Sequence, residues 1–270
     1  MEHSHQNHDR SNHAAAGVSL RGSLPVILTP FYQNKVDFDS LLKLFDHLFP
    51  ELDGYTLCGS TGEAVSLSFD ERAELMKFAV RNTPAGKTIV VGLTHTNLEE
   101  MVRLARLAED LGVHAGLVPC PYYYPNSFPM VRGFFEALDQ ATRLELVIYD
   151  NPAYTKTWLR VEELCILLDA CEHLNAVKIT DHDIDKITAL KGQRQVAIFS
   201  GDDVVAFRSL LVGVVGSMII APSVFPAQYQ RVVKLLEAGE TNEAYRVFSR
   251  SRCRSRYREF AVRPPSPVPC

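Results

Sequence analysis

The segment KTIVVGLTHTNLEEMVRLARLAEDLG, residues 87–112, contains two kinds of apolar spacing in succession. It begins with a short apolar run, IVVGL, which has the length of a buried strand. From residue 98 the apolar residues recur every three or four positions, as in an amphipathic helix. The spacing of Thr96 and Glu99 predicts a capping box at the start of that helix. The segment therefore predicts a strand followed by a helix.

The same order recurs along the chain, and a second capping box is predicted at Ser68 and Glu71. Apolar runs, each followed by a segment of helical period, lie at residues 23–31, 53–60, 87–95, 114–121, 144–152, 174–180, 195–201 and 214–222. Alternating strands and helices imply a parallel sheet, and eight such units predict an α/β fold, the (β/α)8 TIM barrel. The alternative is an open doubly wound sheet. That fold often has a glycine-rich loop after its first strand. Here the first predicted strand ends in LTPFYQN, which contains no glycine.

Three regions are predicted from composition along the chain. Residues 1–17 form a histidine-rich tail, residues 18–248 the barrel, and residues 249–270 a tail rich in arginine and proline. The first tail is interpreted as disordered, with loose metal binding as the alternative. The second could contact RNA, but a shifted reading frame or a disordered end explains it equally well.

The overall composition excludes several classes of protein. The chain has 270 residues, 46% of them hydrophobic and 22% charged, as is ordinary for a globular protein. A net charge of −4 gives no basic field, so no nucleic-acid partner is expected. No membrane span or secretory signal is recognisable. The cysteines are dispersed without the spacing of metal ligands, which predicts free thiols, no metal site and a cytoplasmic location.

One lysine interrupts the apolar run AVKITDH, residues 176–182. In a strand, Val177 and Ile179 share one face and Lys178 lies on the other. A closed barrel has no sheet edge, so this lysine cannot easily reach water. Enclosure lowers the pKa of an amine, and a neutral amine can form a Schiff base with a ketone. The alternative is a buried ion pair with one of three carboxylates: Asp181, Asp183 or Asp202.

Polar residues at other strand ends could complete such a site. In GSTGE, residues 59–63, Ser60 and Thr61 offer hydroxyl groups and consecutive N–H donors for a carboxylate, although an ordinary tight turn would look the same. Tyr149 shares a face with Val147, and its phenol could relay a proton or simply pack. Asn151 and Pro152 are interpreted as shaping the turn that aims this tyrosine.

Six motifs follow one another in a fixed order: GSTGE, PYYY, YDNPA, VKIT, SGDD and GVVGS. This order resembles the dihydrodipicolinate synthase/N-acetylneuraminate lyase family over about residues 20–245. The resemblance implies a (β/α)8 class I aldolase that forms a Schiff base with pyruvate and needs no cofactor.

The resemblance also implies a role for individual residues. Lys178 matches the Schiff-base lysine, and Tyr149 matches the tyrosine that relays protons. Ser60 and Thr61 match the hydroxyl pair that holds the carboxylate of pyruvate, and Ser60 helps the relay. The remaining predicted substrate-binding residues line the pyruvate or acceptor pocket or reach across a dimer interface: Thr180, Val215 and Ser217 for the pocket, and Tyr123 for the interface.

Departures from the family pattern bear on the substrate. Tyr154 stands where synthases place an arginine for aspartate semialdehyde, and a neutral side chain cannot replace a guanidinium fork. Tyr-x-Asn-Pro is also similar to hydratase-aldolases that act on aromatic pyruvate adducts. The C-terminal helical extension usual in the family is predicted to be missing or altered.

The predicted function is a metal-independent lyase or aldolase that cleaves or condenses pyruvate, or another 2-keto acid, with an aldehyde. The predicted assembly is a homodimer or homotetramer. Two alternatives stay open: 4-hydroxy-tetrahydrodipicolinate synthase proper, and a catalytically impaired relative that only binds 2-keto acids.

Overall fold

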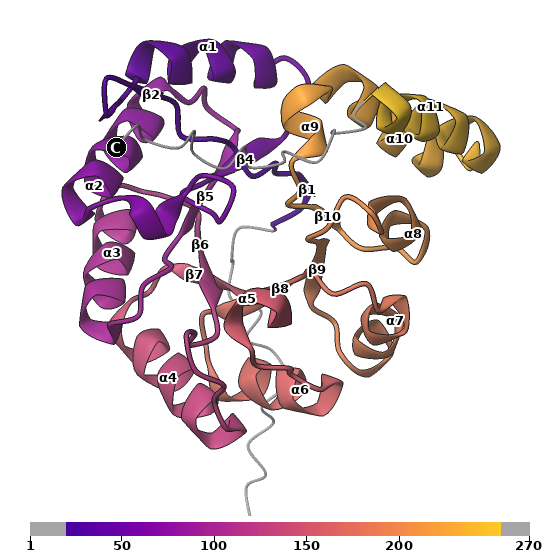
Figure 1. Ribbon diagram of the computed structural model, residues 1–270. Helices are drawn as coiled ribbons and strands as arrows, with labels where there is room; N and C mark the ends of the chain where they lie inside the picture. The colour runs from indigo at the N-terminus through magenta and orange to yellow at the C-terminus, as the bar shows by residue number, and fades with distance from the viewer. Residues whose placement is uncertain (1–19, 255–270) are drawn as a thin grey trace, which may run out of the picture.

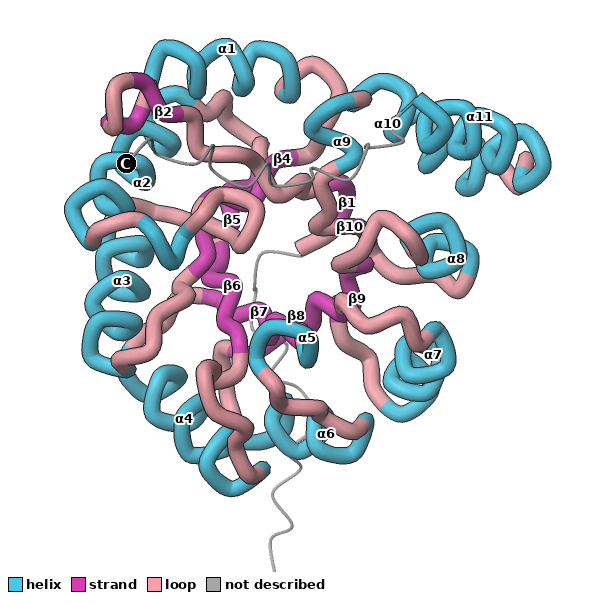
Figure 2. The backbone as a smooth tube through the Cα atoms, in the orientation of Figure 1, coloured by secondary structure: helices cyan, strands magenta, loops and turns pink. Residues whose placement is uncertain are grey.

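A ring of parallel strands surrounded by helices makes up the protein (Figures 1 and 2). The computed structural model describes residues 20–254, and side chains up to residue 250. Its eight-stranded sheet has the order β1-β10-β9-β8-β7-β6-β5-β4. A parallel bridge between Val26 and Thr56 joins the chain after β1 to β4 and closes the ring. The predicted (β/α)8 barrel is confirmed.

The barrel strands are short, and a separate hairpin lies outside them. The barrel strands are β1 (Gly22–Ser23), β4 (Gly54–Leu57), β5 (Thr88–Gly92), β6 (Ala115–Pro119), β7 (Glu145–Asp150), β8 (Leu174–Ile179), β9 (Ala197–Ser200) and β10 (Gly216–Ser217). The hairpin strands are β2 (Phe31–Tyr32) and β3 (Lys35–Val36).

Most of the helices lie outside the ring of strands, as the tube view shows, whereas the short α5 lies over β7 and β8 in this view (Figure 2). The helices are α1 (Phe38–Leu48), α2 (Phe69–Asn82), α3 (Leu98–Asp110), α4 (Phe128–Ala141), α5 (Pro152–Thr155), α6 (Val161–Ala170), α7 (Ile184–Gln193), α8 (Ala206–Leu211), α9 (Ala221–Val224), α10 (Pro226–Glu237) and α11 (Thr241–Arg254), with a short 3-10 turn at Ala64–Ser66. None of these helices has the length and apolar content needed to cross a bilayer.

One of the two predicted capping boxes is present. Ser68 and Glu71 exchange hydrogen bonds at the start of α2, with the Ser68 amide donating to the Glu71 carboxylate at 2.8 Å. The box predicted at Thr96 and Glu99 is wrong. Asn97 is the N-cap of α3 instead, and its side-chain oxygen accepts from the amide of Glu99 at 2.8 Å. Asparagine is at least as good a cap as threonine and stands one residue nearer the helix.

Two apolar layers hold the barrel together. The larger lies between the strands and the helices. The smaller fills the lumen with side chains that alternate with the outward-facing ones, among them Leu24, Val90, Leu117, Val147 and Ala176. Because side chains two residues apart share a face, Lys178 continues the lumen face of Ala176, and Tyr149 continues that of Val147.

The first predicted strand differs from the observed one. Only Gly22–Ser23 form β1, because Pro25 and Pro30 within the predicted run have no N–H to donate to a neighbouring strand. The hairpin β2–β3 that follows was not predicted. Its turn residues Gln33 and Asn34 have φ of 49° and 59°, the left-handed conformation of a tight two-residue hairpin turn.

The last helical segment is divided into two helices that pack side by side (Figure 1). The division falls at Gly239, whose φ of 77° ends α10. The following helix, α11, continues to Arg254, past the predicted barrel boundary at residue 248, and Phe248 packs on Phe207 with ring centroids 5.2 Å apart. The histidine-rich tail and residues 255–270 lie outside the described residues.

Candidate active site

A cavity of about 430 Å³ opens at the carboxyl ends of the barrel strands. This is the edge at which a (β/α)8 barrel collects its functional side chains. Most of the predicted site residues line the cavity: Ser60, Thr61, Tyr149, Lys178 and Thr180. They come from three different strand ends, those of β4, β7 and β8, and the loops that follow them, so the barrel unites residues that are far apart in the sequence.

Lys178 lies at the inner end of this cavity and is only 3% exposed. Its Nζ lies 4.2 Å from the centre of the Tyr149 ring, a cation–π contact when the amine is charged. Loss of hydration lowers the pKa of Lys178 to about 7, and the charges of Asp203 and Asp202 oppose the shift only in part. At neutral pH a large fraction of this amine is therefore unprotonated.

The predicted alternative, a buried ion pair of Lys178, is not found among the side chains of residues 20–250. The three carboxylates proposed as partners have other contacts. Asp181 pairs with Lys186 at 2.9 Å. Asp202 contacts His182 at 3.4 Å, and Asp183 caps the start of α7.

The phenol of Tyr149 is held by two neighbours in the cavity. Asn151 donates from its Nδ2 to the phenol oxygen at 2.8 Å, and the Ser60 hydroxyl lies 3.4 Å from that oxygen. The amide orientation of Asn151 is set by its Oδ1, which accepts from the amide of Tyr154 at 3.2 Å. Because Asn151 can only donate to the phenol, the proton of Tyr149 is left for Ser60 or for a bound substrate.

The contact of Asn151 with the Tyr149 phenol was not predicted, since Asn151 was given only a role in the turn. The signal was available. Tyr149 and Asn151 are two residues apart at a strand end, where side chains of that spacing face the same side.

The loop that carries Ser60 and Thr61 has little freedom. Gly59 has no room for a side chain, since a Cβ there would lie 2.6 Å from Val26 Cγ1. The Thr29 hydroxyl donates to the carbonyl of Gly62 at 2.7 Å and holds the far side of the loop. Two hydroxyl groups are thereby held at the edge of the cavity that contains Lys178.

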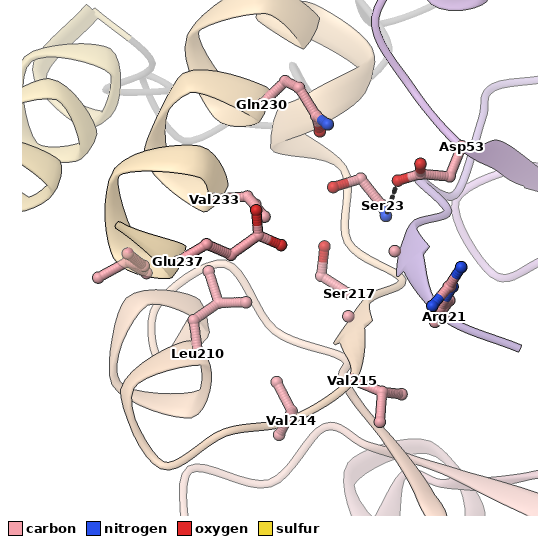
Figure 3. A pocket seen from close by; sticks show the side chains of 13 residues that line it. Arg21, Ser23, Asp53, Leu210, Val214, Val215, Ser217, Gln230, Val233 and Glu237 are labelled. Atoms are coloured by element: carbon pink, nitrogen blue, oxygen red, sulfur yellow. Dashed lines mark hydrogen bonds between the residues drawn. The ribbon is translucent and has the colours of Figure 1, made fainter. Parts of the chain in front are cut away.

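Three predicted site residues lie elsewhere. Val215 and Ser217 line a second cavity at the amino ends of the strands (Figure 3). In this segment Met218 packs in the lumen, so alternation turns Ser217 toward the helices. The segment contributes Met218, Ile219 and Ile220 to the candidate active site instead. Tyr123 is 76% exposed and packs edge-on against Tyr124, outside the cavity.

Acidic and histidine side chains that line this cavity were not predicted to take part in the chemistry. Asp203 accepts hydrogen bonds from the amides of Ala221 at 2.9 Å and Ile220 at 3.3 Å, which anchors the chain after β10. Burial raises the pKa of Asp203. His182 and Tyr154 also line the cavity. Within residues 20–254, no group of three or more histidine, cysteine, aspartate or glutamate residues could hold a metal ion.

Comparison with known proteins agrees with this geometry. The sequence profile of the Dihydrodipicolinate synthetase family matches residues 19–255. The 4-hydroxy-tetrahydrodipicolinate synthase of Aquifex aeolicus (strain VF5) is 26% identical over 231 residues, which span 83% of this chain and 78% of the relative.

Solved structures show the same fold. The 4-hydroxy-tetrahydrodipicolinate synthase of the thermoacidophilic methanotroph Methylacidiphilum fumariolicum SolV has a TM-score of 0.82 at 26% identity, covering 85% of this chain and 78% of that one. The chloride-inhibited dihydrodipicolinate synthase of Acinetobacter baumannii, complexed with pyruvate, has a TM-score of 0.79 at 26% identity, covering 85% and 80%. The cavity, the buried lysine and these matches lead to one conclusion: the chain belongs to the dihydrodipicolinate synthetase family.

Proposed function

We propose that this protein is a Schiff-base-forming lyase or aldolase that cleaves or condenses pyruvate, or another 2-keto acid, with an aldehyde. The observation that carries the proposal is Lys178, a buried amine with a pKa of about 7 and no ion-pair partner among the described side chains. A structural lysine in a barrel lumen would be expected to have a carboxylate partner. An unpaired amine of lowered pKa is suited to attack on a ketone.

The reaction begins when neutral Lys178 attacks the C2 carbonyl of the keto acid. Loss of water gives a protonated imine, which accepts the electron pair released when a C3–H or C3–C4 bond breaks. Ser60 and Thr61 hold the carboxylate through their hydroxyl and amide donors. The Tyr149 phenol passes protons between the carbinolamine oxygen, Ser60 and the aldehyde oxygen.

The cavity mouth bears on the choice of aldehyde. Tyr154, His182, Asp202 and Asp203 line it, and among the residues that line this cavity Lys178 is the only lysine and none is arginine. The carboxylate of aspartate semialdehyde would meet Asp202 and Asp203 and no guanidinium group among the lining residues, so an aldehyde without a carboxylate group is favoured. The relatives named 4-hydroxy-tetrahydrodipicolinate synthase support that activity as the second candidate. A panel of neutral aldehydes and aspartate semialdehyde, each supplied with pyruvate, separates the two.

The proposal is tested by trapping the imine. Incubation with pyruvate and borohydride is expected to reduce the imine to a stable secondary amine, adding the pyruvate skeleton to Lys178. Peptide mass spectrometry locates the adduct. A folded protein that is stabilised against heat by pyruvate but carries no adduct would instead be a catalytically impaired binder.

The rate of adduct formation is expected to depend on pH with a midpoint near 7. Lys178 is protonated below its pKa of about 7 and cannot attack, so the rate should fall about tenfold for each pH unit below that value. Above the midpoint the rate should level off. Stopped trapping reactions between pH 5 and pH 9 measure the profile. A midpoint near 10 would contradict a desolvated amine.

Asn151 is expected to act as a positioning residue for Tyr149. Serine at position 151 can still cap α5 but is too short to donate to the phenol. Asn151→Ser should slow deuterium uptake at the pyruvate methyl group in D₂O about 10- to 100-fold, with pyruvate affinity nearly unchanged. Proton NMR follows the exchange without any aldehyde.

The matched control for this variant is Asn175→Ser, at the exposed start of β8. It should leave deuterium uptake unchanged. Equal rates in Asn151→Ser and wild type would show that the phenol needs no help from the amide. A common loss of pyruvate affinity and heat stability would show a structural role only.

In this proposal the protein acts in the cytoplasm as a homodimer or homotetramer. The support for self-association is the exposed aromatic surface formed by Tyr123 and Tyr124 in the loop between β6 and α4. Tyr123 would contact the active site of a second copy rather than its own. Light scattering of wild type and Tyr123→Ala measures the assembly.

A further inference from the structure

Arg72, near the start of α2, is a buried positive charge at the carboxyl end of the barrel. Its side chain is only 2% exposed. The Nη1 atom donates to the carbonyl of Thr94 at 2.8 Å, and the Nη2 atom donates to the carbonyl of Gly92 at 2.5 Å. Its Nε makes no hydrogen bond within the described part of the chain. Two carbonyl groups thus fix the guanidinium group against the end of β5.

No carboxyl group compensates this charge. Among the side chains of residues 20–250 the ion pairs of arginine belong to other residues, and the titratable neighbours of Arg72 are the Cys58 thiol and the Tyr122 phenol. Burial lowers the pKa of the guanidinium group, but an arginine stays protonated at neutral pH. Because desolvation of an unpaired ion is destabilising, buried charges are usually paired. Arg72 keeps a full positive charge without such a partner.

The charge lies behind the loop that contains Ser60 and Thr61. Cys58 follows β4 and comes directly before this loop. Burial raises the pKa of the Cys58 thiol to about 11, and the neighbouring Arg72 charge opposes this shift. Gly92 packs closely on Cys58, since a Cβ at position 92 would lie 2.0 Å from the Cys58 carbonyl oxygen. The guanidinium group is therefore held beside the residue that stands two positions before Ser60.

The active-site cavity itself offers no cation to a keto acid. Lys178 is the only lysine among the residues that line it, none is arginine, and Lys178 must be neutral to attack the ketone. Asp202 and Asp203 line the same cavity. A carboxylate that enters would therefore meet negative charge from this pair. A positive charge behind the hydroxyl loop offsets that repulsion without contact, because Coulomb interactions are weakly screened in a buried environment.

We propose that Arg72 is a positioning residue that makes the Ser60–Thr61 loop prefer a carboxylate over a neutral group. The proposal rests on the proposed function for the identity of the keto acid and for the place where its carboxylate binds. Arg72 acts on the carboxylate through its charge and holds the adjoining chain through the carbonyls of Gly92 and Thr94. Arginine suits both tasks, since a guanidinium group reaches two acceptors at once and stays charged when buried.

The test compares pyruvate with pyruvamide, which has a neutral carboxamide in place of the carboxylate and nearly the same shape. Both ligands are titrated against Lys178→Met, in which no imine can form, and proton NMR of the ligand methyl group gives the two dissociation constants. Pyruvate is expected to bind more tightly. Adding Arg72→Gln should lower the ratio of pyruvate affinity to pyruvamide affinity about tenfold. Arg72→Lys keeps the charge and should restore most of the ratio.

The matched control is Arg81→Gln, an exposed arginine in the last turn of α2, which should leave the ratio unchanged. Both ligands are measured on one preparation, so any loss of folded protein cancels in the ratio. An unchanged ratio in Arg72→Gln, including an equal loss of affinity for both ligands, would overturn the inference and leave Arg72 as a support of the loop only.

The wild-type protein separates this inference from the proposed function. A wild type that forms no imine adduct would overturn the proposed function, while the affinity ratio in Lys178→Met would still test Arg72. A wild type that forms the adduct, together with an unchanged ratio in Arg72→Gln, would overturn the inference alone. A protein that binds neither ligand would overturn both.

Discussion

The Lys178→Met variant is expected to form no adduct with pyruvate and borohydride and to lose about 10⁴- to 10⁶-fold in turnover, as removal of a nucleophile does in other enzymes. Methionine has a similar length and keeps the packing over the Tyr149 ring. The change therefore removes the nucleophile while the cavity keeps its shape. Mass spectrometry and a coupled aldol assay measure both quantities. The control is Lys234→Met, an exposed lysine of α10, which should keep full activity.

The same variant is expected to be more stable than wild type at low pH. The pKa of Lys178 is about 7 in the folded protein and 10.5 when unfolded. Between these values the unfolded chain binds more protons, so the free energy of unfolding of wild type rises with pH across this window. Lys178→Met lacks that rise and should be more stable by about 3–5 kcal/mol at pH 6, with the gap closing toward pH 10. Urea unfolding of both proteins at pH 6 and pH 10 tests this. The same difference in free energy of unfolding at the two pH values would contradict the desolvation of Lys178.

The Lys186→Met variant is expected to lose about 3–5 kcal/mol of folding stability, because it leaves a buried carboxylate without its partner. Lys186 lies 2.5 Å from the Oδ2 of Asp150, which is fully buried between β7 and α7. Burial raises the pKa of Asp150 to about 6, and the ammonium group beside it keeps the pair ionised at neutral pH. Without Lys186, Asp150 should take up a proton more readily, so the loss should be smaller at pH 5 than at pH 8.

A double variant distinguishes charge compensation between Asp150 and Lys186 from the packing of the Lys186 side chain. Asp150→Asn with Lys186→Met removes both charges and should recover most of the stability lost in Lys186→Met. Lys234→Met should stay within about 0.5 kcal/mol of wild type. Chemical unfolding measures all three. A double variant as unstable as Lys186→Met would show that the lysine contributes packing and not charge compensation.

Much of the fold was predictable because it follows from the spacing of apolar residues within each segment. The strand and helix periods recur through the chain and produce the barrel without reference to distant residues. The Ser68–Glu71 cap is local in the same way. The predictions failed where two neighbouring residues could each cap a helix, as Thr96 and Asn97 could for α3. They also failed where proline interrupts an apolar run, as in the first predicted strand.

The candidate site was predictable only in part. Alternation placed Lys178 and Tyr149 on the lumen face, and strand order brought Ser60 toward them. The resemblance assigned Val215 and Ser217 to the same pocket, but the parity of the chain near β10 turns them away from it. The spacing of Asn151 from Tyr149 could have predicted that the two side chains share a face, but the orientation of the Asn151 amide depends on the backbone of Tyr154.

The sequence by itself determined that eight strand–helix units close into a barrel and that Lys178 faces its lumen. Both results follow from the spacing of apolar residues, which recur every second residue in strands and every third or fourth residue in helices. This spacing can be read within a single segment. Only the tertiary structure decided that Lys178 is desolvated and lacks a carboxylate partner, while Asp150 and Asp181 pair with Lys186. Those outcomes depend on distances between strand ends and helices that are remote in sequence, and the pKa of an amine depends on such distances and on the water they exclude.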